Sequence, residues 1–251
     1  MIRRPKAKMP LTMAPDTKTA LRSVQSFIAD RLAGNPVHIY EAGGGSLSVL
    51  PLDSLNAASV TVVDIDEDQL RNNKYATIKI LGDIQTHNFA PGSIDLVVCY
   101  NVIEHLHSPD LAIECFHRAL KPGGVLFIGA PNPQSIFGLI TKYTPHLLHV
   151  WIYRVILKNR DAGKPGRGPF PVIFHPIVSP HRLLRFCEKT GFEVRYFSLY
   201  TSPHYAFLTQ KQSVLGFLLR GISRFINMLP NPRLRVAEGD YHAVFEKVSR
   251  A

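Results

Sequence analysis

The sequence contains few cysteines and no long apolar run. Only three of its 251 residues are cysteine, and no two of them have the CxxC spacing of a zinc or redox site. Neither a disulfide framework nor a structural zinc site is therefore expected, and a cytoplasmic location is predicted. No segment reaches the roughly eighteen uncharged apolar residues of a transmembrane helix. The basic N-terminus is not followed by the apolar core of a secretory signal.

Acidic residues are scarce in two parts of the chain, and the net charge of the whole is +10. Residues 132–187 contain eight basic residues and one acidic residue, and residues 202–235 contain five basic residues and no acidic one. Residues 37–131, in contrast, carry eleven acidic and five basic residues. An acidic body with basic appendages suits an anionic partner, which can be a phosphorylated or carboxylated substrate, an anionic membrane surface or nucleic acid. The alternative is charge that serves only solubility.

Apolar runs alternate with helical repeats over most of the chain. Buried strands are predicted at residues 37–40, 59–63, 76–81, 94–100, 125–130, 192–199 and 241–248. Helices are predicted at residues 17–33, 108–120 and 179–190. This alternation predicts a single α/β domain over residues 1–251, with a doubly wound, mostly parallel sheet of seven strands in a Rossmann-like fold.

Three segments lie outside this alternation. Residues 1–16 are predicted to be a basic, flexible arm. Residues 132–178 are rich in proline and glycine, and because they follow the fifth strand we expect a cap insertion over the substrate side. Residues 203–235 form a second insertion before the last strand, and residues 213–229 within it have the pattern of an amphipathic helix. Its basic polar stripe suits a membrane surface, and packing on the body or on a partner subunit is equally compatible.

A glycine-rich turn, Glu41-Ala42-Gly43-Gly44-Gly45, follows the first predicted strand. Glycines let the backbone approach a ligand closely, and ligands of doubly wound sheets bind at the carboxyl ends of the strands. Asp64 ends the next strand, where a carboxylate can bind both hydroxyls of a ribose. Gly82-Asp83 follows the third strand, where Asp83 can accept from an adenine amino group. NAD enzymes share the first two features, so these residues predict a nucleoside without choosing one, and a plain turn remains the alternative for each.

Two further elements complete an ordered set of motifs. They are Asn101-Val102-Ile103-Glu104-His105, after the fourth strand, and the turn Lys121-Pro122-Gly123-Gly124. With these, the sequence resembles the class I methyltransferases that depend on S-adenosylmethionine (SAM), especially the small-molecule enzymes of the ubiquinone-biosynthesis type. The resemblance covers about residues 20–131 and returns at 179–194. One departure is Leu47, which stands where that family usually has a third spaced glycine.

The resemblance implies that SAM is the cofactor and that the chain is a methyltransferase. The glycine turn would hold the methionine portion, the second and third strands would end at the ribose and the adenine, and the fourth at the methyl group. The residues so implied are Glu41, Gly43, Gly44 and Gly45 for the methionine portion, Asp64 with its neighbour Ile65 for the ribose, Asp83 and Ile84 for the adenine, and Asn101 and Val102 for the methyl end.

A histidine is the candidate general base. Alignment of donor and acceptor can supply much of the rate of methyl transfer, but a hydroxyl acceptor must also lose a proton. His105, His107 and His175 are candidates, and His105 is preferred because it follows Glu104 beside the fourth strand. A structural role at the start of the next helix is the alternative for His105. No metal site is assigned, because alternate residues of a loop seldom converge on one ion.

The sequence therefore predicts a SAM-dependent methyltransferase that acts on a hydroxyl of a small-molecule, glycan or lipid-linked acceptor, which can be anionic. An RNA- or DNA-modifying enzyme is a second hypothesis. Against it, no nucleic-acid module is appended, and Cys99-Tyr100-Asn101-Val102 does not resemble the Asn/Asp-Pro-Pro-Tyr element of amino-methylating DNA enzymes. A non-catalytic SAM-binding protein is a third hypothesis, which Glu41, Asp64 and Asp83 argue against. Residues 213–229 leave open peripheral contact with the inner face of the membrane, beside packing on the body or on a partner subunit.

Overall fold

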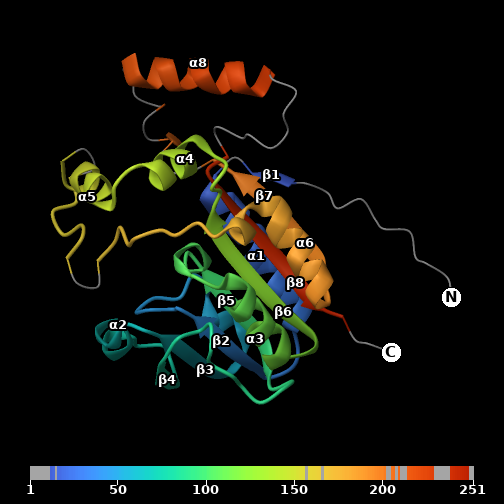
Figure 1. The fold of residues 1–251 in the computed structure, drawn as a ribbon. Helices are drawn as coiled ribbons and strands as arrows, with labels where there is room; N and C mark the ends of the chain where they lie inside the picture. The colour runs from blue at the N-terminus through green and yellow to red at the C-terminus, as the bar shows by residue number, and fades with distance from the viewer. Residues whose placement is uncertain are drawn as a thin grey trace.

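The computed structural model has one central sheet with helices packed on both of its faces (Figure 1). Three further helices lie at one end of the sheet. The structure describes residues 12–14, 16–155, 158–164, 167–201, 205–206, 209, 214–228 and 238–248.

The sheet has eight strands in the order β1-β7-β8-β6-β5-β2-β3-β4. They are β1 (Thr12–Ala14), β2 (Val37–Ala42), β3 (Ala57–Asp64), β4 (Ile78–Leu81), β5 (Ile94–Tyr100), β6 (Leu120–Pro131), β7 (Phe192–Tyr200) and β8 (Asp240–Lys247). All neighbours are parallel except the two pairs that β8 makes with β6 and β7. The predicted doubly wound, mostly parallel sheet is confirmed, and all seven predicted strands form.

The eighth strand lies in the predicted flexible arm. Thr12–Ala14 pairs in parallel with Ser198–Tyr200 of β7, so this part of the arm is a strand at the sheet edge. Residues 1–11 lie outside the described part. The predicted turn at residues 121–124 is instead a bulge within β6: Gly123 has a φ of +78°, and the register between β5 and β6 shifts there.

The helices are α1 (Thr17–Leu32), α2 (Glu67–Asn72), α3 (Pro109–Ala119), α4 (Ile136–Tyr143), α5 (His146–Val155), α6 (Pro180–Thr190) and α8 (Val214–Met228), with single 3-10 turns η1 (Leu52–Leu55), η2 (Ile103–His105) and η3 (Pro176–Val178). Local signals set their ends. Asp16 caps α1 by accepting a hydrogen bond from the backbone N–H of Thr19. Both α3 and α6 begin with a proline, and α6 ends at Gly191 in the left-handed conformation.

Two apolar layers cover the sheet. On one face, Phe116 of α3 and Leu183 of α6 pack on the strands, and on the other, Val24 of α1 and Leu70 of α2 do so. Strands buried on both faces account for the nearly continuous apolar runs in the sequence.

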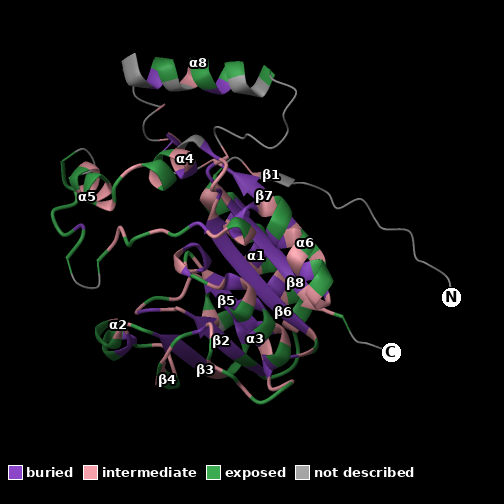
Figure 2. Cartoon of the chain, viewed as in Figure 1, coloured by how far each residue is buried: buried purple, intermediate pink, exposed green. Residues whose placement is uncertain are grey.

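The appendages differ from this body. The cap insertion forms α4, α5 and η3, and the predicted amphipathic helix is α8, while Ser213 and Leu229 lie outside the described residues. Figure 2 shows many exposed residues along α5 and α8 and few along the strands. No helix in the described part is long and apolar enough to span a membrane.

Candidate functional site

The glycine turn after β2 is closely packed. Gly43 and Gly45 have φ values of +70° and +52°, which side chains of L-residues rarely adopt. A Cβ on Gly43 would lie 2.6 Å from Cγ1 of Val102, and one on Gly44 would lie 2.8 Å from Cβ of Glu41. Backbone conformation and close packing therefore both require glycine at these positions of the turn.

Asp64 joins the end of β3 to this turn. Its buried carboxylate accepts hydrogen bonds of 2.9 Å from the backbone N–H of Gly45 and 2.9 Å from that of Asp66. On the other side, the Asn73 amide donates to the carbonyl of Gly45 at 2.6 Å. Each Asp64 oxygen keeps a second lone pair, so both remain able to accept from the hydroxyls of a ribose.

Glu41 is buried under the same turn. Its carboxylate accepts a hydrogen bond from the hydroxyl of Ser48, and burial raises its pKa to about 7. A cationic amino group beside it would favour the charged carboxylate and offset this cost of burial. The glycine turn, the carboxylate of Asp64 with its free lone pairs, and the buried Glu41 together fit the SAM that the resemblance implies.

Several residues that support the turn were missed from the sequence. Tyr75 donates from its hydroxyl to the carbonyl of Gly44 at 3.2 Å, and the Gln69 side chain fills the space where a Cβ of Gly45 would lie. With Asn73 they come from α2 and the loop after it. No motif marks them, because their contribution depends on how this loop folds back on the turn.

The residues predicted for the adenine lie in different environments. Asp83 is exposed, and its carboxylate accepts from the backbone N–H of Gln85 at 2.8 Å. Ile84 is buried in the core, whereas Ile65, next to Asp64, is 78% exposed. Of the two isoleucines, Ile65 therefore presents apolar surface at this edge, and the contact of Ile84 with adenine stays a prediction.

The segment after β5 reaches the glycine turn. Asn101 adopts the left-handed conformation, with a φ of +54°, and its N–H donates to the carbonyl of Gly129 at 2.8 Å. This sharp turn brings Val102 against Gly43. Val102 thus lies beside the glycine turn, and the contact of Asn101 and Val102 with the methyl end of the cofactor stays a prediction.

His105 lies in η2, beside the cap. Its Nδ1 is 2.6 Å from the carbonyl oxygen of Pro171, and its ring is nearly perpendicular to that of Phe170, with the ring centroids 6.1 Å apart. A carbonyl oxygen only accepts, so Nδ1 carries the proton and the neutral ring has its lone pair on Nε2. Burial lowers the pKa of His105 from its usual 6.5, which favours that neutral form at neutral pH.

Glu104 lies beneath His105 and is fully buried. Its Oε1 is 3.7 Å from Nε2 of His105, and its Oε2 has no hydrogen-bond partner among the described residues. Burial raises the pKa of Glu104 to about 8, and the carboxylate of Asp240 adds to this effect. Its backbone carbonyl accepts from the N–H groups of Ile173 and Phe174, which ties the cap to η2.

Three more ionisable residues that the sequence analysis missed lie at the same edge, because β8 runs antiparallel and begins where the other strands end. Burial raises the pKa of Asp240, the first residue of β8, to about 7. The hydroxyl of Tyr200 is 3.0 Å from Nε2 of His242, whose pKa burial lowers to about 4. Their positions follow from strand pairing and from no local motif.

The other candidate histidines have different surroundings. Nδ1 of His175 accepts from the backbone N–H of Ile177 at 3.3 Å and caps η3, so this nitrogen is engaged in structure. His107 is exposed. Within the described ranges, no group of three or more His, Cys, Asp or Glu side chains is placed to hold a metal ion.

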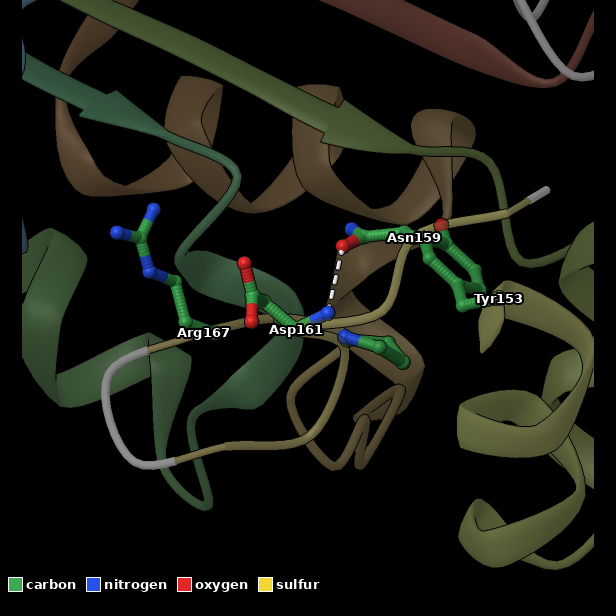
Figure 3. Close-up of a pocket in the computed structure, with 6 residues that line it drawn as sticks. Tyr153, Asn159, Asp161 and Arg167 are labelled. Carbon is green, nitrogen blue, oxygen red and sulfur yellow. Dashed lines mark hydrogen bonds between the residues drawn. The ribbon is translucent and has the colours of Figure 1, made fainter. Parts of the chain in front are cut away.

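A hollow of about 380 Å³ lies in the cap (Figure 3). Its lining residues are Tyr153, Asn159, Asp161, Arg167, Gly168 and Pro169. The backbone N–H of Asp161 donates to the side-chain oxygen of Asn159 at 3.2 Å. All of its lining belongs to the cap and none to the glycine turn, so it is separate from the predicted cofactor residues.

Known proteins resemble this chain in sequence and in fold. A family model described as a methyltransferase domain matches residues 41–128. The ubiquinone biosynthesis O-methyltransferase of Pseudomonas aeruginosa (strain LESB58) is 32% identical over 173 residues, which cover 61% of this chain and 74% of that protein. That of Pseudomonas syringae pv. tomato is 32% identical over 180 residues, with the same coverage of each chain.

Solved structures share the fold at low identity. A SAM-dependent methyltransferase from Archaeoglobus fulgidus has a TM-score of 0.56 at 18% identity, covering 92% of this chain and 96% of its own. The [4+2]-cyclase SpnF has a TM-score of 0.57 at 16% identity, covering 94% and 85%. The fold thus serves more than one reaction, and the sequence relatives decide the family. This chain is an enzyme that belongs to the class I SAM-dependent methyltransferases.

Proposed function

We propose that this enzyme transfers the methyl group of SAM to a hydroxyl of a small-molecule, glycan or lipid-linked acceptor, with His105 as the general base. The observation that carries the proposal is the contact of His105 Nδ1 with the carbonyl of Pro171, which leaves the lone pair on Nε2. The relatives from Pseudomonas are named O-methyltransferases, which supports a hydroxyl acceptor.

Bound SAM supplies a methyl group that is already activated on a sulfonium centre. The protein binds it through the glycine turn and Asp64, and Val102, three residues before His105 in the sequence, packs against this turn. The acceptor hydroxyl gives its proton to Nε2 of His105 as the hydroxyl oxygen attacks the methyl carbon and the bond from this carbon to sulfur breaks. Pro171 keeps the ring in the required tautomer. The buried carboxyl of Glu104, which its raised pKa keeps protonated at neutral pH, lies 3.7 Å from Nε2 and faces the imidazolium as a neutral dipole.

The cap supplies the contacts to the acceptor. Phe170 packs on His105, and Tyr153 and Arg167 line the hollow in the cap. The strong excess of basic over acidic residues in 132–187 favours an acceptor that carries an anionic group. Cys99, Cys115 and Cys187 are free and buried, which is compatible with a reaction in the reducing cytoplasm.

The test is a transfer assay with methyl-labelled SAM and a cell extract divided into lipid and aqueous fractions. We expect label in a product that resists mild alkali, as a methyl ether does and a methyl ester does not. Label that mild alkali releases, or label in RNA or DNA, would exclude the proposal.

His105→Gln tests the base, because glutamine keeps the polarity but cannot take up the proton. We expect kcat to fall on the order of a hundredfold while SAM affinity stays unchanged. In the unchanged protein the rate should rise with pH and reach its plateau before about pH 6.5. The reason is that the pKa of His105 is lowered from 6.5, so its neutral base form already prevails at that pH. His107→Gln is the matched control. If both variants retained full kcat, His105 would not be the base.

A further inference from the structure

Helix α8 turns its small and polar side toward the rest of the chain and its apolar side toward solvent. Gly216 and Ser223 are buried, and a guanidinium nitrogen of the half-buried Arg220 donates to the carbonyl of Thr209. These positions are three or four residues apart, so one small and polar stripe faces the rest of the chain. An amphipathic helix of a globular protein normally buries its apolar stripe instead.

The opposite stripe of α8 is apolar and faces solvent. Phe217 is 73% exposed, Phe225 is 66% exposed and Met228 is 83% exposed, with Leu218 and Ile222 beside them. An exposed apolar stripe of this size on one helix marks an interaction site. Figure 1 places α8 clear of the sheet, at the end where the cap helices lie.

Helix α5 carries a second exposed apolar stripe at the same end. Leu147, Trp151 and Val155 are spaced four residues apart and are all exposed. Trp151 is the single tryptophan of the sequence. Its fluorescence therefore reports on this stripe alone.

The charge around both stripes identifies the partner. α8 contains two arginines and no acidic residue, and Arg224 is exposed beside its apolar stripe. On the cap, Lys142, Arg154 and Arg160 are exposed near α5. A second copy of this chain would place like charges against one another, which opposes association. An apolar stripe flanked by basic residues matches the surface of a bilayer with anionic headgroups.

We propose that α8, together with the exposed stripe of α5, docks on an anionic lipid bilayer. The apolar side chains enter the boundary between headgroups and acyl chains, and the basic residues contact the headgroups. The cap, which adjoins His105, then lies at the membrane surface. This contact is independent of which acceptor is methylated, so the failure of one proposal leaves the other standing.

The experiment is co-sedimentation of the full chain with two kinds of vesicle, phosphatidylcholine alone and phosphatidylcholine with phosphatidylglycerol. We expect partition onto the anionic vesicles, weakened by added salt. We also expect the Trp151 emission to shift to shorter wavelength and to be quenched by brominated acyl chains.

Two exposed aromatic residues provide the variant. Phe217→Ser with Phe225→Ser should lower partition about tenfold or more, because their burial in the interface is lost. Both side chains are exposed, so the fold should be retained, which a thermal melt checks. Leu111→Ser, at an exposed position of α3, is the matched control and should partition like the unchanged protein.

Three outcomes would overturn the proposal. The double variant could partition as strongly as the control, or neither vesicle could bind the protein. The protein could also elute as a dimer that the double variant converts to a monomer, which would assign the stripe to a second copy. Partition without a change in Trp151 emission would overturn the part assigned to α5.

Discussion

The cofactor half of this enzyme, around the glycine turn, and the proposed acceptor half, around His105 and the cap, are built in different ways. In the cofactor half, the backbone N–H of Gly45 bonds to Asp64, 19 residues away, and acidic residues predominate. In the acceptor half, His105 bonds to Pro171, 66 residues away, and Asn132 bonds to Glu238, 106 residues away. The first half is held together by contacts between motifs that are near in sequence, and the second by contacts between segments that are far apart in sequence.

The largest expected effect tests the cofactor half. Asp64→Ala removes the hydrogen bond that joins β3 to the glycine turn, a second hydrogen bond from the N–H of Asp66, and the oxygens predicted to bind the ribose. Because hydrogen bonds to a buried charge are strong, SAM affinity should fall about a thousandfold. Isothermal titration with SAM measures the change. Asp68→Ala, an exposed position in the same segment, is the control, and equal affinity in the two variants would mean that Asp64 does not bind the ribose.

This difference in construction decides what the sequence could predict. Each cofactor motif follows a strand, and parallel strands bring their carboxyl ends to one edge, so Glu41, Asp64 and Asn101 could be placed together beforehand. The order of the elements also identified the sheet. β1 was missed because three residues carry no periodic signal and their pairing with β7 depends on the finished sheet.

The acceptor half could not be predicted in the same detail. Asp240 is near Glu104 only because β8 runs antiparallel to its neighbours. No pattern in the sequence around Asp240 predicts that β8 runs in this direction. The tautomer of His105 depends on a cap loop whose path no local pattern encodes. His175 has the right residue type, but its Nδ1 caps η3.

The second prediction tests the buried charge of the acceptor half. The folded protein holds a proton on Glu104 up to about pH 8, whereas the unfolded chain releases it near its usual pKa of 4.5. The unfolded state therefore binds fewer protons between these values, and this group lowers stability as pH rises from 4.5 to 8. Glu104→Gln should remove that loss and gain on the order of 2 kcal/mol over the unchanged protein at pH 8.

Urea unfolding at pH 5 and pH 8 measures this difference. Glu114→Gln, at an exposed position of α3, is the control and should leave the pH dependence as it is. An equal pH dependence in Glu104→Gln and Glu114→Gln would show that Glu104 ionises normally in the folded state.

The third prediction separates packing from backbone strain in the glycine turn. Gly43→Ala places a methyl group 2.6 Å from Val102 and adopts an unfavourable φ, so we expect a loss of about 2 kcal/mol in unfolding free energy. Gly34 has a φ of +90° with open space around it, so Gly34→Ala carries the strain alone, about 1 kcal/mol. Thermal melts of both variants give the comparison, and equal losses would mean that the contact with Val102 is not tight.

The smallest expected effect concerns the exposed rim of the cofactor half. Asp83 lies in solvent and already accepts hydrogen bonds from the backbone N–H and the side-chain amide of Gln85, so a bond from the adenine amino group competes with water. Asp83→Ala should therefore lower SAM affinity only about fivefold, far less than Asp64→Ala. S-adenosylhomocysteine, which has the same adenine, should lose the same factor, and titration of both ligands checks this. A loss as large as that of Asp64→Ala would mean that Asp83 becomes buried against the adenine once the cofactor is bound. The exposed rim at Asp83 would then determine cofactor affinity as much as the buried turn does.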